Sequence, residues 1–255
     1  MKIAVCVKAV PDAATGRRID DASKRLDRGG DLALSDFDSH AVEEGLRVKE
    51  AAGEGEVVVV SMGPERSADA VRKTLAMGAD RAVLVTDDAF AGADLLVTAR
   101  ALAGALERER ADLVLFGQQS ADGDGACLFA AVAEHLRRPV ISQVSELSVG
   151  AGTVTGKRQT EYGYERVRAP LPAVIAVSDA INEPRYPSLK GIMGAKAKPQ
   201  ETLSAADVGG AGESRTTVLG LASPPARGES RRVEDGDPGE AAEAIVEFLV
   251  EKRVL

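Results

Sequence analysis

The stretch best suited to ligand chemistry is the loop of small and acidic residues between Phe116 and Ala126. It follows the apolar run 112–116 and precedes a helical pattern, so it joins a predicted strand to a predicted helix. Small residues let the backbone approach a ligand closely, and the free amides at a helix start favour a phosphate. The loop therefore favours phosphate binding. The plainer alternative is a turn that needs its glycines for geometry and uses Asp124 as the helix cap.

Two aspartates limit how this loop could hold a phosphate. Asp122 and Asp124 carry the same sign of charge as a phosphate, so we expect them to cap the helix or to bind ribose hydroxyls. A metal-dependent hydrolase that uses both carboxylates is a minor alternative. No G-x-G-x-x-G follows the first predicted strand and no Walker lysine motif is present, so the sequence lacks a Rossmann dinucleotide fingerprint and a P-loop.

The histidines and cysteines form no recognisable catalytic or zinc-binding set. His40 and His135 are expected on helix surfaces, and Cys6 lies in an apolar run typical of a buried strand. Cys127 begins a predicted helix, where the pKa of a thiol can fall, but no base accompanies it. Their spacing matches no zinc-ligand pattern. The residues indicate binding without visible bond-making chemistry.

The composition excludes several classes of protein. The 255 residues carry 32 Lys and Arg against 40 Asp and Glu, and this formal charge of -8 disfavours general nucleic-acid binding. No apolar run approaches the roughly 20 residues of a membrane span. The first residues indicate a strand and not a secretory leader, and two cysteines without a leader indicate a reducing cytoplasm.

Aromatic residues are scarce. The chain has no Trp, three Tyr and five Phe, whereas a protein that stacks bases or a flavin ring usually supplies aromatic platforms. If this chain handles such a ligand, much of the ring environment has to come from elsewhere.

The apolar periodicity predicts alternating strands and helices in the first half of the chain. Strands are predicted at 2–7, 56–62, 81–86 and 112–116, and helices at 39–52, 67–78, 94–108 and 126–137. This alternation predicts βαβ units, hence an α/β fold with a doubly wound, mostly parallel sheet and helices on both faces. The polar stretch 8–38 is expected to be a long loop that holds a small hairpin.

The pattern changes after residue 140. The expected elements are an antiparallel strand pair at 153–158 and 162–168, a buried strand at 171–177, an aperiodic segment at 182–199, a linker at 204–215, an extended stretch at 216–236 with Pro224 and Pro225, and a helix at 238–252. The last helix has one apolar face and no core of its own, so we expect this extended arm and helix to pack on a partner subunit.

The parallel sheet also predicts where a ligand would lie. Open parallel sheets bind ligands beyond the carboxyl ends of their strands, where the strand order reverses. Four segments fall at such ends, namely 7–12, 35–40, 61–66 and 117–126. They are expected to meet at one edge of the sheet.

The segment AVIAVSDAINEPRYPSLKGIMGAKAKP at 173–199 resembles the signature of the electron-transfer flavoprotein β subunit. The resemblance continues, in the same order, through HAVEEGLRVKE (40–50), TLAMGADRA (74–82), DLVLFGQQSADGDG (112–125) and LPAVIAV (171–177), and the final EFLVEKRVL is also similar. It covers nearly the whole chain. The implied domains are an adenine-nucleotide-binding α/β domain at 1–203, which includes a recognition loop at 182–199, and a C-terminal arm and helix at 204–255.

The resemblance implies an electron carrier and not an enzyme with its own substrate. The family forms a heterodimer with an α subunit, with FAD between the subunits and a structural AMP in β. It accepts electrons from flavin dehydrogenases, such as acyl-CoA dehydrogenases of fatty acid oxidation, and passes them to a quinone oxidoreductase. Two alternatives stay open: a bifurcating type with a second FAD in place of AMP, and a stand-alone adenine-nucleotide-binding regulatory domain.

The resemblance also implies site residues. The expected cofactor-binding residues are Cys6, Val7, Ser35, Asp36, Phe37, Asp38, Met62, Gln119, Ser120, Ala121, Asp122, Gly123, Asp124, Gly125 and Ala126. Phe37 matches the aromatic that approaches the flavin, while a second such aromatic is Ala13 here. Cys127, Leu128 and Phe129 replace polar or small family residues, and the bulk of Leu128 and Phe129 favours AMP over a second FAD.

The expected partner-binding residues are Tyr186, Leu189, Ile192 and Met193. Leu189 matches the family's anchoring leucine, which inserts into a pocket on partner dehydrogenases. One exposed aliphatic anchor with polar neighbours suits a weak, quickly reversible contact. The alternative is that Leu189 folds back on its own domain.

Overall fold

The computed structural model describes residues 1–15, 18–222 and 237–255. Gly16 of the predicted long loop, and residues 223–236 of the predicted extended stretch with Pro224 and Pro225, lie outside the described residues. The chain divides into two compact units, Met1–Val218 and Leu219–Leu255.

A nine-stranded sheet forms the centre of the first unit, with the strand order β11-β10-β9-β12-β8-β1-β6-β7-β13. Its parallel strands are β1 (Lys2–Val7), β6 (Glu56–Met62), β7 (Arg81–Val85), β8 (Leu113–Gly117), β12 (Ala173–Val177) and β13 (Gln200–Leu203). The chain proceeds outward from β1 through β6 to β7 and then returns to β8 on the other side of β1. The strand order therefore reverses beside β1 and β8, where such sheets bind ligands.

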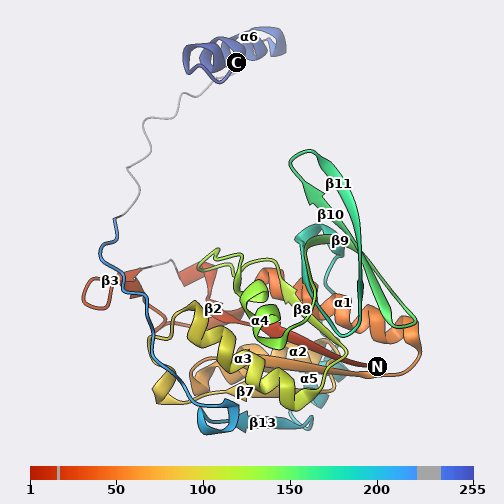
Figure 1. The fold of residues 1–255 in the computed structure, drawn as a ribbon. Coiled ribbons are helices and arrows are strands. Elements are labelled where there is room, and N and C mark those ends of the chain that lie inside the picture. Colours follow the sequence, from red (N-terminus) through yellow and green to blue (C-terminus); the bar gives the residue numbers. More distant parts are fainter. Residues whose placement is uncertain (16–17, 223–236) are drawn as a thin grey trace. The chain divides into compact units, whose positions relative to one another are not determined.

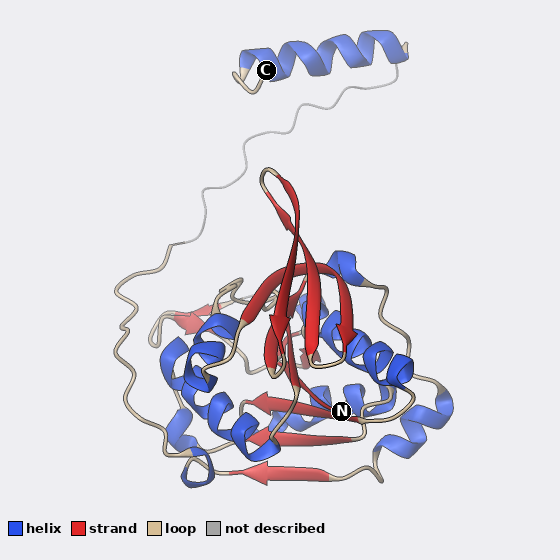
Figure 2. Cartoon of the chain, turned by 45° about the vertical axis from the view of Figure 1, so that its right-hand side comes forward, coloured by secondary structure: helices blue, strands red, loops and turns tan. Residues whose placement is uncertain are grey.

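Helices cover both faces of this sheet (Figures 1 and 2). The covering helices are α1 (Asp36–Ala52) and α2 (Ala68–Met77) on one face, and α3 (Leu95–Glu109) and α4 (Leu128–Leu136) on the other. Alternate residues of β1 enter two separate cores, because successive strand side chains point to opposite faces. Ile3 and Val5 join the core under α1 and α2, whereas Ala4 and Cys6 join the core under α3 and α4. The predicted α/β class is confirmed.

An antiparallel ribbon extends one end of the sheet (Figure 2). It consists of β9 (Val140–Gly150), β10 (Thr153–Thr160) and β11 (Gly163–Pro170). The expected antiparallel pair is thus present as β10 and β11. The strand β9 was not predicted from the sequence. Only its Ile141 and Val144 are buried, so its apolar pattern is weak.

Two helix starts differ from the predictions. α1 begins at Asp36 with Ser35 as its N-cap residue, so Phe37 and Asp38 lie in its first turn and not in a preceding loop. The acidic residues of that turn complement the positive end of the helix dipole. The alternative in which Asp124 caps the helix after β8 is wrong, because α4 begins at Leu128 and its N-cap residue is Cys127.

Several short elements lie where the sequence shows no clear period. They are β2 (Ala9–Pro11) paired with β5 (Leu32–Leu34), β3 (Ile19–Asp20) paired with β4 (Arg25–Leu26), α5 (Leu189–Ala195), and the 3₁₀ turns at Ala13–Thr15, Glu65–Ser67, Asp88–Phe90, Asp179–Ile181 and Ala206–Val208. The expected hairpin in the long loop is therefore present. Part of the expected linker packs on the domain, because Ala205 and Val208 are buried in the core under α3.

In the described part of the second unit, residues 219–222 and 237–255, there is one helix, α6 (Pro238–Glu251). Asp237 caps it by accepting a hydrogen bond from the Gly239 amide, and Pro238 occupies the first helical position, where a missing N–H costs nothing. Its apolar side chains, including Ile245 and Phe248, are exposed.

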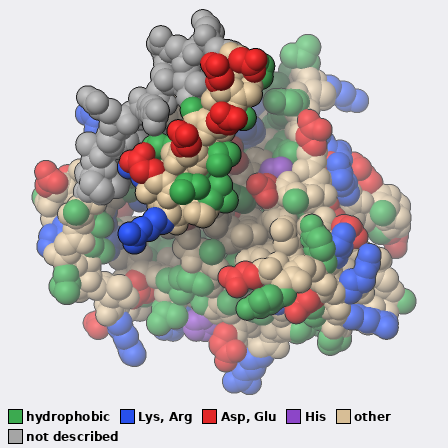
Figure 3. All heavy atoms as spheres, turned by 90° about the horizontal axis from the view of Figure 1, so that it is seen from above, with side chains coloured by type: hydrophobic (Ala, Val, Ile, Leu, Met, Phe, Trp, Pro, Cys, Tyr) green, Lys and Arg blue, Asp and Glu red, His purple; other side chains and the backbone are tan. Residues whose placement is uncertain are grey.

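Acidic and basic side chains are interspersed over the face that Figure 3 presents.

Candidate functional site

A cavity of ≈ 900 Å³ lies beyond the carboxyl ends of β1, β6, β7 and β8. Val7, Met62, Thr86 and Gly117 stand at or just after those four strand ends, and all four line the cavity. Apolar side chains such as Phe116 form part of the wall. The volume is within the usual range for a small-molecule or cofactor site.

Most of the expected cofactor-binding residues line this cavity. The lining members are Cys6, Val7, Asp38, Met62, Gln119, Ser120, Gly123, Gly125 and Ala126. Of the others, Asp36 is exposed and Phe37 is half-buried at the start of α1, outside the cavity wall. Ser35 and Asp122 lie beside the cavity, where their side chains bond to other parts of the site.

The first turn of α1 is fixed against the loop after β8. The Ala121 amide donates to the Ser35 hydroxyl at 3.2 Å, and the Lys8 amide donates to the Asp38 carboxylate at 2.7 Å. A Cβ placed on Gly117 would lie 2.6 Å from Asp38 Oδ1 and 2.6 Å from the Phe37 carbonyl carbon. Gly117 therefore permits the close approach of α1 to β8 at the cavity.

Asp122 brings two cations to the cavity wall. Its carboxylate is almost fully buried, lies 2.8 Å from Lys8 Nζ and forms a second ion pair with Arg28. Burial would raise the pKa of Asp122, but its bonds to Lys8 and Arg28 outweigh this and lower the pKa to about 2. Since both carboxylate oxygens hold cations, the arrangement disfavours Asp122 as a metal ligand. Both cations line the cavity themselves.

Asp38 behaves in the opposite way. Burial raises the pKa of Asp38 to about 7, although the Lys8 and Gly117 amides donate hydrogen bonds that partly oppose the rise. Burial also raises the pKa of Cys6, and the nearby charge of Asp38 adds to this effect. The cavity wall therefore holds a largely protonated thiol and a carboxyl that titrates near neutral pH.

The loop from Gly117 to α4 presents backbone and not side chains at the helix start. No side chain caps α4, so its first backbone amides donate no hydrogen bond to a capping side chain. Asp124 and Ala126 adopt φ values of 46° and 45°, the left-handed region that non-glycine residues rarely occupy. Strain of this kind often marks a binding site. With Lys8 and Arg28 nearby, these features suit a phosphate-bearing ligand.

Arginines attach the polar loop to the rim of the cavity at three places. Arg28 pairs with Asp122, Arg25 donates to the Gly92 carbonyl at 2.9 Å, and Arg66 donates to the Gly29 carbonyl at 3.1 Å. Neither Lys8 nor Arg28 was among the site residues expected from the sequence. Lys8 had a usable signal, because it directly follows the first predicted strand, but Arg28 lies in a stretch without periodicity.

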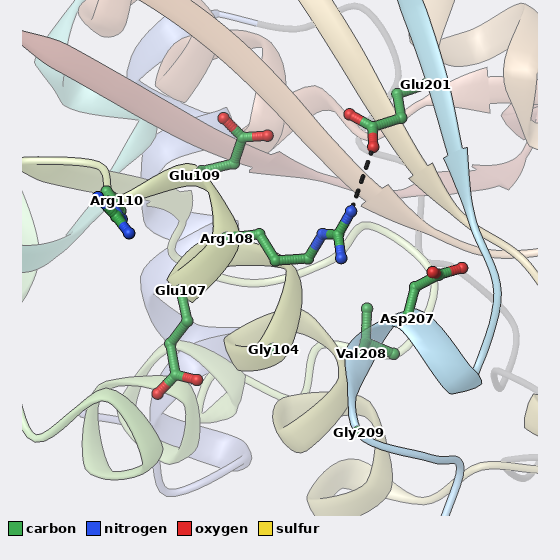
Figure 4. A pocket seen from close by; sticks show the side chains of 9 residues that line it. All are labelled: Gly104, Glu107, Arg108, Glu109, Arg110, Glu201, Asp207, Val208 and Gly209. Carbon is green, nitrogen blue, oxygen red and sulfur yellow. Dashed lines mark ion pairs between the residues drawn. The ribbon is translucent and has the colours of Figure 1, made fainter.

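A second hollow, of ≈ 620 Å³, lies between the end of α3, β13 and the Ala206–Val208 turn (Figure 4). Several of its charged groups, including Arg108, Glu201 and Asp207, have partners within the protein. Arg108 lies 3.6 Å from Glu201, and the Asp207 carboxylate accepts from the Ser204 hydroxyl at 2.6 Å. Because these charges are already paired, we assign no ligand to this hollow.

Among residues 1–15, 18–222 and 237–255, no group of three or more His, Cys, Asp or Glu side chains could hold a metal ion. The described helices include none that is long and apolar enough to cross a membrane. Cys6 and Cys127 are both free thiols, the first buried and the second exposed.

The expected partner-binding residues form an exposed apolar surface around α5. Tyr186, Leu189, Ile192 and Met193 have relative exposures of 93%, 82%, 52% and 80%. The alternative that Leu189 folds back on its own domain is therefore wrong. His40, expected on a helix surface, is only half-exposed, because its ring contacts the Asn182 carbonyl at this segment.

The sheet and its cavity place the chain among α/β proteins that hold a ligand at the carboxyl ends of parallel strands. Comparison with known proteins narrows this class. The family model described as the electron transfer flavoprotein domain matches residues 25–208. The chain belongs to the electron transfer flavoprotein family, and within it to the β subunits.

Relatives match along almost their whole length. The chain is 41% identical to the electron transfer flavoprotein subunit beta of Mycobacterium tuberculosis, with 99% of each chain covered. It is 38% identical to the subunit of the same name from Mycobacterium leprae, again with 99% of each covered. It is also 34% identical to the caffeyl-CoA reductase–Etf complex subunit CarD of Acetobacterium woodii, with 100% of each covered.

Proposed function

We propose that this chain pairs with an electron-transfer flavoprotein α subunit and carries electrons from flavin dehydrogenases to a quinone oxidoreductase. The cavity at the strand ends, in a chain of this family, is the observation that carries the proposal. In this role the chain makes and breaks no substrate bond itself. The acyl-CoA dehydrogenases of fatty acid oxidation are the proposed donors, and the proposed location is the cytoplasm.

The proposed ligand of the cavity is AMP. A phosphate would find the uncapped amides of α4 and the cations Lys8 and Arg28, while an adenine ring would find an apolar wall that includes Phe116. Asp122 would hold the two cations in place and not touch the phosphate itself. In this role AMP is structural and ties the loop after β8 to the long polar loop.

FAD is proposed to lie between the two subunits and to supply the electron-accepting ring. Phe37 is the proposed contact from this chain, at the exposed start of α1. The α subunit would supply most other contacts, which agrees with a chain of three Tyr, five Phe and no Trp. The C-terminal arm and α6, at 204–255, are proposed to pack on the α subunit, since the apolar side chains of α6 are exposed.

Co-expression with an α subunit tests this proposal directly. We expect a yellow heterodimer that releases one FAD and one AMP on denaturation, counted by chromatography. A colourless, stable monomer that binds no α subunit would instead support the stand-alone regulatory domain and overturn the proposal.

The second candidate is the bifurcating type, with FAD in place of AMP. The observation that favours it is the similarity, over the full chain, to a subunit named as part of a caffeyl-CoA reductase complex. The same chromatography separates the two types. Two FAD and no AMP would reject the AMP-binding version, and one of each would reject the second FAD.

The apolar surface at α5 is the proposed contact for dehydrogenases. Leu189→Ala is expected to raise the KM for a reduced acyl-CoA dehydrogenase, because it removes the most exposed aliphatic side chain of α5. Flavin content and heterodimer stability should not change. Loss of flavin in this variant would show that Leu189 has a different role.

A further inference from the structure

The segment that presents this apolar surface is attached at its two ends to two different helices. Residues 182 and 185 bond to α1, and Lys198 bonds to the end of α2. Between these attachments the chain exposes Tyr186, Leu189 and Met193. The polar contacts thus hold the ends of a segment whose middle has little apolar burial of its own.

Arg185 makes the densest of these attachments. Its Nε and Nη2 donate to the two Glu43 oxygens at 2.7 and 3.1 Å, and its Nη1 and Nη2 donate to the two Glu50 oxygens at 2.6 and 3.1 Å. Its backbone amide adds a bond to Glu43 at 3.2 Å. One guanidinium therefore holds two carboxylates bidentately, each on α1 and separated from Arg185 by 142 and 135 positions in the chain.

The electrostatics show that this is a firm contact on the Glu43 side. The Glu43 side chain is only 4% exposed, whereas the Glu50 side chain is 58% exposed, so solvent screens the second ion pair more. Burial raises the pKa of Glu43, but the bonds from Arg185 outweigh this and lower it overall. Lysine could not replace Arg185, because an ammonium group is a point charge and cannot bond two carboxylates in this planar geometry.

Asn182 extends the attachment toward the preceding strand. Its amide nitrogen donates to the His40 carbonyl and to Glu44 Oε2, each at 3.0 Å, while the His40 ring contacts the Asn182 carbonyl at 2.9 Å. Arg185 is thus the last polar attachment to α1 before the exposed surface begins at Tyr186.

The far end of the segment rests on α2. Lys198 Nζ donates to the Leu75 carbonyl at 3.0 Å and to the Ala79 carbonyl at 2.5 Å, which satisfies acceptors at the end of that helix. A Cβ on Gly191 would collide with the Ala76 carbonyl, so glycine permits the close approach of α5 to α2. The segment is therefore fixed on both sides of Leu189.

We propose that Arg185 is a positioning residue that holds the apolar surface around Leu189 in the shape that docks a flavin dehydrogenase. The inference rests on the proposed docking function of that surface. A contact made by a few exposed side chains binds weakly, and its apparent affinity is proportional to the fraction of time that the surface spends in the docking shape. Arg185 raises that fraction without touching the partner.

The test uses Arg185→Met in the co-purified heterodimer. The readouts are KM and kcat for an acyl-CoA dehydrogenase reduced by its acyl-CoA substrate, FAD content, and amide hydrogen exchange across 186–195. If the surface keeps its docking shape a tenth of the time, KM rises about tenfold, with kcat and FAD content unchanged. Exchange in α5 should also accelerate, and Arg185→Lys should give an intermediate KM.

Two further variants control for a fault in folding. Arg47→Met removes the other arginine on Glu43, 3.0 Å away, but Arg47 lies within α1 and holds no part of the segment, so KM should stay at the wild-type value. The double variant Glu43→Gln with Arg185→Met leaves no uncompensated buried carboxylate and should retain the raised KM.

The outcomes separate this inference from the proposed function. If Leu189→Ala raises KM but Arg185→Met changes neither KM nor exchange, the positioning role is overturned and the docking function stands. If Leu189→Ala leaves KM unchanged, the docking function itself fails, and the inference fails with it. An equal effect of Arg47→Met and Arg185→Met would show that only the charge on Glu43 matters and would overturn the inference.

Discussion

The cavity and the segment 182–199 are both attached to α1, but through carboxylates of opposite behaviour. Asp38, in the first turn of α1, has a pKa raised to about 7 by burial and is bonded by backbone amides. Glu43, further along the helix, has a lowered pKa because Arg185 and Arg47 bond it. The same helix therefore carries a carboxyl group that titrates near neutral pH at the ligand cavity, and a carboxylate that stays ionised in an ion pair beside the exposed surface.

The contrast extends to what each region leaves available. At the cavity, Lys8 and Arg28 are held by Asp122 yet still line the space where an anionic ligand would enter. At the segment, Arg185 is engaged by two carboxylates, and the exposed apolar side chains of Tyr186, Leu189 and Met193 lie among exposed charged ones such as Lys190 and Lys196. A resident charged ligand needs cations within reach, whereas a transient protein contact needs an exposed apolar anchor, which polar and charged neighbours can surround.

The largest expected difference between the regions is in pH dependence. The pKa of Asp38 rises from about 3.9 in an unfolded chain to about 7 in the fold, so its contribution to stability is complete below pH 4 and is lost as the pH rises through 7. Relative to the wild type, Asp38→Asn should therefore gain about 4 kcal/mol in unfolding free energy between pH 4 and pH 8, at about 1.4 kcal/mol per pKa unit.

Glu43→Gln is the matched variant in the other region. The pKa of Glu43 is lowered in the fold, so its contribution is present above the unfolded pKa of about 4.3 and is lost only as the pH falls below it. Its difference from the wild type should stay constant between pH 5 and pH 8. Denaturant unfolding of the heterodimer at several pH values checks both variants. If the difference in unfolding free energy between Asp38→Asn and the wild type did not change with pH, the predicted difference between the two regions would be contradicted.

The parts of the cavity that the sequence predicted are those set by local pattern. The apolar runs predicted β1, β6, β7 and β8, and the small residues after Phe116 predicted a loop at the carboxyl ends of the strands. The ends of parallel strands meet at one edge whatever the detailed packing, so this much follows from periodicity. The role of Arg28 could not be predicted, because Arg28 lies in an aperiodic stretch and pairs with a residue 94 positions away in the chain.

The segment 182–199 was less predictable in structure. Only seven residues, Leu189–Ala195, form a helix there, and the tertiary contacts of Gly191 and Lys198 with α2 hold it in place. No apolar period results, because only Ala195 of that helix is buried. The exposed residues were identified through the family resemblance, whereas the role of Arg185 required the geometry of Glu43 and Glu50.

Two glycines give the next largest contrast. Gly117→Ala would place a Cβ 2.6 Å from Asp38 Oδ1 and from the backbone of Phe37, neither of which can move without shifting the start of α1. We expect a loss of about 2–3 kcal/mol in stability, typical of overpacking, together with loss of nucleotide. Gly191→Ala should instead displace α5 from Ala76 and raise KM for the dehydrogenase, with nucleotide retained.

Thermal unfolding, nucleotide counts and steady-state kinetics on the same preparations separate these two outcomes. Gly150 offers a control for each, since it lies outside both regions, a Cβ there meets nothing within 4 Å, and Gly150→Ala should change none of the three readouts. Loss of nucleotide from Gly191→Ala would show that the two regions are not independent.

The smallest expected effects come from replacing one arginine in each region by methionine. Arg28→Met should weaken AMP retention about tenfold, or about 1.4 kcal/mol, because it removes one of two cations at the cavity while Lys8 still pairs with Asp122. KM for the dehydrogenase should not change. Arg185→Met should do the reverse, raising KM and leaving AMP bound. Both quantities are measured on each variant, AMP by chromatography after denaturation and KM by electron transfer. If each variant alters both AMP retention and KM, a change in one region reaches the other. The helix α1, which carries Asp38 at the cavity and Glu43 at the segment, would then couple the two regions.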